Sequence, residues 1–133
     1  MSRFTVALPI ADRQRAATFY RETLGLELVG TPADDGLPEP LLLRLDDEVL
    51  LALVPADGLA WVLGEQPLAA PGVTECLLGV TVDTAADVDA LADRVRGAGG
   101  SVVRAPAAQA WGYTAVCTDP DGHAWQITAA AAS

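Results

Sequence analysis

Residues 77–104, LLGVTVDTAADVDALADRVRGAGGSVVR, predict a strand, a capped helix and a second strand in that order. Apolar side chains recur up to Val82, as in a strand that contacts a core. Thr84 with Asp87 three residues later resembles a capping box, in which each side chain bonds the backbone N–H group of the other residue. Gly99-Gly100 ends the helix. An apolar stripe at helical spacing indicates the face that packs on a sheet, and it consists of Val88, Leu91, Val95 and Ala98.

The same order of signals occurs near the start of the chain. Residues 4–8 predict a strand, Asp12 is a plausible N-cap, and residues 13–23 predict a helix that Gly25 ends. This helix also has an apolar stripe, formed by Ala16, Phe19, Tyr20 and Thr23. Further strands are predicted around residues 26–29, 41–45, 49–54, 113–118 and 124–128. Each half of the chain is therefore a βαβββ module.

The repeat predicts an α+β fold. Module one spans about residues 3–54, a Pro/Gly-rich connector spans 55–74, and module two spans about 75–128. One such module leaves a half-covered sheet, whereas two can pair their sheets into a curved, eight-stranded cup with the helices outside. A chain of 133 residues suits a single domain of this kind, 1–133.

The composition of the chain excludes some classes of binding partner. The net charge of −10 argues against nucleic acid, which requires clusters of Lys and Arg, and against anionic membrane surfaces. No apolar run approaches the ~20 residues that span a bilayer, and the N-terminus lacks the regions of a signal peptide. Cys76 and Cys117 have no metal-binding spacing and are predicted to be buried, inert thiols. We therefore expect a cytoplasmic protein.

Both ends of the chain carry motifs of a known superfamily. Residues 8–12, followed by Phe19-Tyr20 and by Leu24-Gly25-Leu26, resemble the opening of vicinal oxygen chelate proteins. Residues 119–127, DPDGHAWQI, are similar to the closing hairpin of that superfamily, and Trp111-Gly112-Tyr113 also fits. The superfamily includes glyoxalase I, extradiol dioxygenases, thiol transferases that inactivate fosfomycin, and bleomycin-resistance proteins. The resemblance therefore implies a fold and leaves several functions open.

In the metal enzymes of the superfamily, His, Gln or Glu ligands come from strands that line the cup. The resemblance places those positions at Thr5, Leu77 and Gln126, with Leu51 or Ala52 at an optional fourth site. These side chains do not form the set of imidazole and carboxylate donors that divalent metals require. His123, the only histidine, lies in the turn before the last strand and is expected at the rim. We expect no metal, no cofactor and no catalytic residue.

The cup lining follows from strand alternation. If Thr5 faces inward, Ala7 does too, and Leu77 and Gln126 follow by the same phase, whereas the parity of residues 50–54 stays open. The resemblance implies that the segments carrying Trp61, Trp111 and Tyr113 pass near the mouth of the cup, where these aromatic side chains can form walls for a planar ligand. Alternatively, each tryptophan can pack against its own loop or a dimer partner. The candidate ligand-binding residues are Thr5, Ala7, Leu51, Trp61, Leu77, Trp111, Tyr113 and Gln126.

Three functions fit this sequence. A small, neutral cup on an acidic chain favours a metal-independent protein that binds a cationic or aromatic drug or natural product, as bleomycin-resistance proteins do. A metal-dependent lyase, isomerase or dioxygenase is the alternative, and a cluster of His and Glu donors would identify it. The third function is an interaction module without a ligand, and loops or large side chains that fill the cup would identify it. The resemblance also implies a homodimer.

Overall fold

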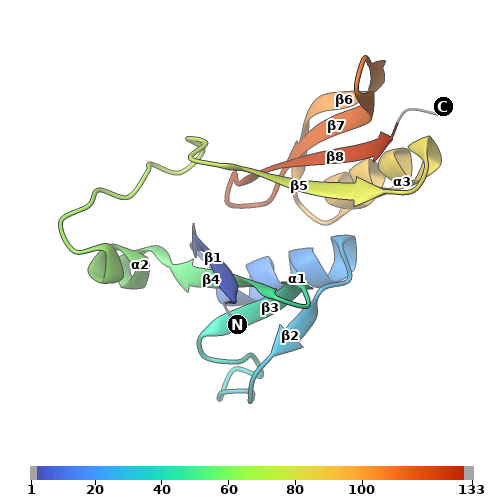
Figure 1. Cartoon of the computed structure of the whole chain (residues 1–133). Coiled ribbons are helices and arrows are strands. Elements are labelled where there is room, and N and C mark those ends of the chain that lie inside the picture. The colour runs from blue at the N-terminus through green and yellow to red at the C-terminus, as the bar shows by residue number, and fades with distance from the viewer. Residues whose placement is uncertain (1–2, 131–133) are drawn as a thin grey trace. The chain divides into compact units, whose positions relative to one another are not determined.

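The structure is a computed structural model that describes residues 3–130. The chain divides into two compact units, Met1–Leu68 (unit 1) and Ala69–Ser133 (unit 2). The boundary falls within the predicted connector. Each unit contains one four-stranded mixed sheet and a helix that packs on it (Figure 1).

Unit 1 follows the predicted element order and adds one helix. Its strands are ordered β1-β4-β3-β2, with β1 parallel to β4 and the other pairs antiparallel. The acidic turn between β3 and β4 lies where it was predicted. The elements are β1 (Phe4–Ile10), α1 (Arg13–Thr23), β2 (Glu27–Val29), β3 (Leu41–Asp46), β4 (Val49–Pro55) and α2 (Ala56–Leu63).

Unit 2 repeats this topology. The strand order is β5-β8-β7-β6, and β5 is parallel to β8. In Figure 1, α3 lies along one face of this sheet. The elements are β5 (Leu77–Val82), α3 (Ala85–Gly97), β6 (Ser101–Gln109), β7 (Gly112–Thr118) and β8 (Ala124–Ala130). The doubled βαβββ order is thus confirmed.

The predicted caps begin both sheet-packed helices. The Asp12 carboxylate accepts a hydrogen bond of 2.9 Å from the Arg15 backbone N–H group, so α1 starts at Arg13. At α3, Thr84 and Asp87 bond each other's backbone N–H groups at 3.1 Å, which completes the capping box. Each bond satisfies a donor that the helix itself leaves without a partner.

The helix stripes form the core of each unit. All of the predicted α1 stripe is buried, and Tyr20 is 0% exposed. In unit 2, α3 buries Val88, Leu91 and Val95 against a sheet face that includes Trp125, as predicted. Phe4 lies outside this core, because it begins the edge strand β1 and is 66% exposed.

Two segments have more regular structure than the sequence predicted. The connector contains the eight-residue helix α2, in which Leu59, Val62 and Leu63 fall at i, i+3 and i+4 spacing although only Leu59 is buried. The strand predicted to end at Arg104 continues as β6 to Gln109. It tolerates Pro106 because β6 is an edge strand with irregular register between Arg104 and Ala107. The last strand, predicted around residues 124–128, continues as β8 to Ala130. None of the helices in residues 3–130 has the length and apolar content needed to cross a bilayer.

Candidate functional site

Each sheet has a helix face and an open face. Residues paired across neighbouring strands point to the same side of a sheet, so the strand register identifies the residues of each face. In unit 2 the helix face holds the buried core. We call the opposite side the open face of unit 2, and the paired residues that form it are Leu77, Gly79, Thr81, Ser101, Arg104, Ala107, Gln109, Gly112, Thr114, Val116, Thr118, Ala124, Gln126, Thr128 and Ala130.

The middle of this open face is a row of four residues that crosses all four strands. Gly79 pairs with Gln126, Gln126 with Val116, and Val116 with Arg104. A side chain placed on Gly79 would meet no heavy atom within 4 Å, and the backbone there is not in the left-handed region. Glycine is therefore not required by conformation, and it leaves free space next to the Gln126 amide.

A row of hydroxyls lies beside the middle row. Thr81 pairs with Thr128, and Thr128 pairs with Thr114. The Thr114 and Thr128 hydroxyl oxygens are 3.1 Å apart, and the Thr114 hydroxyl donates to the Ile127 carbonyl oxygen at 3.0 Å. Because the Thr114 hydroxyl hydrogen is committed to the Ile127 carbonyl oxygen, the Thr128 hydroxyl donates to Thr114. Thr128 can therefore only accept a hydrogen bond from a ligand, whereas Thr81 can also donate one.

The open face of unit 1 is more apolar. Ala7 pairs with Ala52, Ala52 with Leu42, and Leu42 with Val29, so its middle row lacks hydrogen-bonding side chains. Thr5 adds one hydroxyl in the next row. That row also contains Leu50 and the charged pair Arg44 and Glu27. The two units are therefore alike in topology but differ in their middle rows, which are apolar in unit 1 and include Gln126 and Arg104 in unit 2.

Two predicted site residues lie on the wrong face. Leu51 pairs with Val6 and Leu43, is 0% exposed and belongs to the unit 1 core, so Ala52 and not Leu51 shares a face with Thr5 and Ala7. Tyr113 pairs with Ala129 on the helix face of unit 2, and its hydroxyl donates to the Asp89 carboxylate of α3 at 2.7 Å. That hydrogen bond raises the pKa of Tyr113. Both errors arise because a shift of one residue in a strand reverses the face.

Of the remaining predicted site residues, four lie on strands and the two tryptophans lie on α2 and in the β6–β7 turn. Thr5, Ala7 and Leu77 are exposed, and Gln126 is half-buried. Trp61 is 84% exposed on α2, and Trp111 is 61% exposed in the β6–β7 turn, so neither tryptophan is packed against its own loop.

The cysteines follow the sequence prediction at one position only. Cys117 is buried, and burial raises the pKa of its thiol, which suits an unreactive core residue. Cys76 is exposed just before β5, so the prediction that it is buried was wrong.

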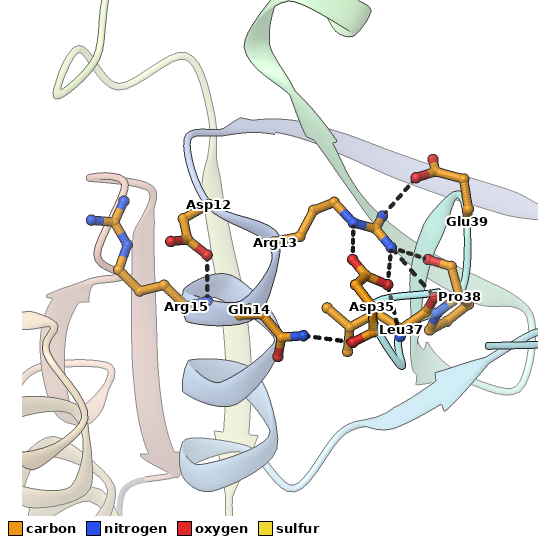
Figure 2. Close-up of polar contacts among 8 residues, drawn as sticks. All are labelled: Asp12, Arg13, Gln14, Arg15, Asp35, Leu37, Pro38 and Glu39. Carbon is orange, nitrogen blue, oxygen red and sulfur yellow. Dashed lines mark hydrogen bonds and ion pairs between the residues drawn. The ribbon is translucent and has the colours of Figure 1, made fainter. Parts of the chain in front are cut away.

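The sequence patterns also gave no role to Arg13, the first residue of α1. Figure 2 shows its guanidinium extending from the first turn of α1 to the β2–β3 loop. There it pairs with Asp35 at 2.9 Å and with Glu39 at 3.1 Å, and it donates to the Pro38 carbonyl oxygen at 2.9 Å. Gln14 adds a bond of 2.8 Å to the Asp35 carbonyl oxygen. The acidic and Pro-rich loop is therefore fixed to α1.

The contact between Arg13 and Asp35 is expected to weaken in acid. The hydrogen bond from Arg13 holds the pKa of the Asp35 carboxyl below its ordinary value of 3.8. Because the pKa of Asp35 is lower in the folded state, the ionised carboxylate contributes its full stability above the ordinary pKa. That stability is lost as the pH falls through the folded-state pKa. The Leu37 amide, which donates to Asp35 at 3.0 Å, should lose protection from hydrogen exchange over that range. Asp35→Asn should lack this pH dependence, and an unchanged profile in the variant would contradict the assignment.

Comparison with known proteins agrees with this architecture. A model of the Glyoxalase/Bleomycin resistance protein/Dioxygenase superfamily matches residues 4–127. The chain belongs to this superfamily. The resemblance inferred from the two terminal motifs is thereby confirmed. No curated protein matches the sequence at a significant level.

Solved structures of the glyoxalase/bleomycin-resistance type share the fold. A glyoxalase-related enzyme from Fulvimarina pelagi is 26% identical, with a TM-score of 0.79 over 96% of this chain and 87% of that one. TnmS3, an antibiotic binding protein from Streptomyces sp. CB03234, is also 26% identical, with a TM-score of 0.64 over 98% of this chain and 97% of that one. A hypothetical protein from S. aureus is 25% identical, with a TM-score of 0.78 over 97% and 92% of the two chains.

Metal enzymes occur in the glyoxalase superfamily, and the sequence resemblance assigns their metal-ligand positions to four residues of this chain. Thr5, Leu77, Gln126 and Ala52 provide a hydroxyl, two aliphatic groups and one amide. This set does not fit a divalent metal, which requires several imidazole or carboxylate donors. Within residues 3–130, no three His, Cys, Asp or Glu residues are grouped so that they could hold a metal ion.

Proposed function

We propose that this superfamily member is a metal-independent protein that binds and sequesters a small drug or natural product of cationic or aromatic character. The observation that carries the proposal is the middle row of the open face of unit 2, where the free space over Gly79 adjoins the Gln126 amide. Small side chains with a few hydrogen-bonding groups suit an organic ligand held by shape.

Two other facts support the same function. TnmS3 is an antibiotic binding protein, and the present chain aligns with nearly all of it at 26% identity. The net charge of −10 raises the local concentration of cationic compounds near the surface. We further propose that the two units act as one domain in a cytoplasmic homodimer, as the superfamily resemblance implies.

Ligand titration tests the proposal. The exposed Trp61 and Trp111 should report binding through a saturable change in tryptophan fluorescence at neutral pH and low salt. A suitable panel contains bleomycin, cationic planar dyes such as ethidium and proflavine, and uncharged polycyclic aromatic compounds. Flat titrations across this panel would count against the binding function.

Gly79→Val should separate binding from folding. The substitution fills the free space beside Gln126 with a residue that suits a strand, so we expect ligand affinity to fall at least about tenfold while thermal stability is retained. Gly97→Ala is the matched control, because it also places a new Cβ in open space but lies at the end of α3. Equal affinity of the two variants would remove Gly79 from the site.

A metal-dependent enzyme is the second candidate, because a 26% identical structure is described as a glyoxalase-related enzyme. Elemental analysis of protein purified without chelators distinguishes the two. Close to one transition metal per chain would overturn metal independence. An absence of metal after incubation with nickel, zinc, manganese and ferrous iron would retain the binding function.

A further inference from the structure

Arg104 is the one charged residue among the paired residues of the open face of unit 2. It ends the row that begins at Gly79, and it is exposed. Within residues 3–130 its side chain makes no ion pair or hydrogen bond. Arg96 on α3 differs, because its side chain pairs with Asp93 at 3.1 Å.

The backbone around Arg104 is irregular on both sides. The register between β6 and β7 shifts between Val102 and Arg104 and again between Arg104 and Ala107. Register shifts of this kind re-aim a side chain and are enriched next to functional sites. Val103, the extra residue at the first shift, is 66% exposed. The edge strand is therefore distorted at the position that supplies the cation.

Gln126 and Arg104 are placed to contact the same ligand group. They lie on β8 and β6, with Val116 of β7 between them in one row. Two strand spacings separate their backbones by roughly 9–10 Å. Both side chains are long enough to converge above Val116, which provides an apolar floor. A planar skeleton can then cover Val116 and the space over Gly79.

We propose that the ligand is a planar aromatic compound that carries an acidic group, such as a carboxylate or phenolate, bound by Arg104 and Gln126. This inference rests on the proposed binding function and selects its aromatic class over its cationic class. A guanidinium presents paired N–H donors that match the two oxygens of a carboxylate, and the Gln126 amide adds a further donor. On a chain with a net charge of −10, a single unpaired cation within a neutral face is a local site for an anion.

Three probes with one skeleton test the inference. They are 9-anthracenecarboxylate, 9-anthracenemethanol and 9-(aminomethyl)anthracene, which carry an anionic, a neutral and a cationic substituent of similar size at the same position. Equilibrium dialysis at neutral pH should give the carboxylate at least about tenfold higher affinity than the alcohol, and the amine the lowest affinity. Affinity for the carboxylate should also fall with added salt, whereas affinity for the alcohol should not.

Arg104→Gln should remove the preference for the carboxylate and leave the affinity for the alcohol unchanged. Arg96→Gln makes the same change in net charge on α3, so it should keep the preference. If the wild type binds all three probes equally, or prefers the amine, the inference is wrong but the binding function stands. If Gly79→Val and wild type alike bind none of the probes, both proposals fail for planar aromatic compounds. A preference that survives in Arg104→Gln would assign the acidic group to another cation and overturn the role of Arg104.

Discussion

Replacing Leu51 with alanine is expected to lower the free energy of unfolding by about 2–5 kcal/mol, the range for removing a large aliphatic side chain from a core. Leu51 is 0% exposed and pairs with Leu43, which is also 0% exposed. The space left by the truncation cannot collapse easily, because β4 lies in the interior of the unit 1 sheet between β1 and β3. Urea denaturation followed by circular dichroism measures the change.

Leu50→Ala provides the matched control, since it makes the same truncation one residue earlier in β4. Leu50 pairs with Thr5 on the open face and is only half-buried. We expect a loss of less than about 1.5 kcal/mol, because less apolar area leaves water there on folding. If Leu50→Ala cost more than Leu51→Ala, the assignment of the two faces would be reversed, and Leu51 would return to the candidate site.

Gly112→Ala is expected to destabilise unit 2 by about 3 kcal/mol or more. Gly112 has a φ of +146°, a region that is nearly restricted to glycine. A Cβ atom there would lie 2.5 Å from the Ala129 carbonyl oxygen and 3.3 Å from the Thr128 methyl group. The β7–β8 pairing must therefore shift, and thermal unfolding of the variant should begin at a clearly lower temperature.

Gly25→Ala separates the two causes of that effect. Gly25 has a φ of +64° after α1, but a Cβ there would meet nothing within 4 Å. Only the backbone cost of the left-handed region applies, about 1–2 kcal/mol. Similar losses in the two variants would mean that the contact with Ala129 contributes little and that β8 moves freely at this point.

Local signals in the sequence were sufficient to predict most of the fold. The Asp12 cap and the Thr84–Asp87 capping box fixed the helix starts, since each depends only on residues within one turn. The apolar stripes then identified the buried face of each helix. The doubled order of elements followed from these signals, and the superfamily from motifs at residues 8–26 and 111–127.

Features that depend on pairing between strands were predicted less well. The sequence left the parity of residues 50–54 open, and the β1–β4 register was needed to assign Leu51 to the core. The bonds of Arg13 to the β2–β3 loop join residues more than twenty positions apart, which no local pattern reports. The row from Gly79 to Arg104 also exists only after four strands are in register. Candidate site residues on one strand were therefore easier to predict than the site as a whole.

The parallel pairing of the first and last strands in each unit has a consequence for the order of events during synthesis. β1 has no strand partner until β4 has been made, so the first sheet cannot close before Pro55 has emerged from the ribosome. The strands that close this sheet and the helix that packs on it all belong to unit 1. N-terminal units commonly fold first during translation. We expect the nascent chain to hold a folded first half while the strands that carry Gly79, Gln126 and Arg104 are still being added.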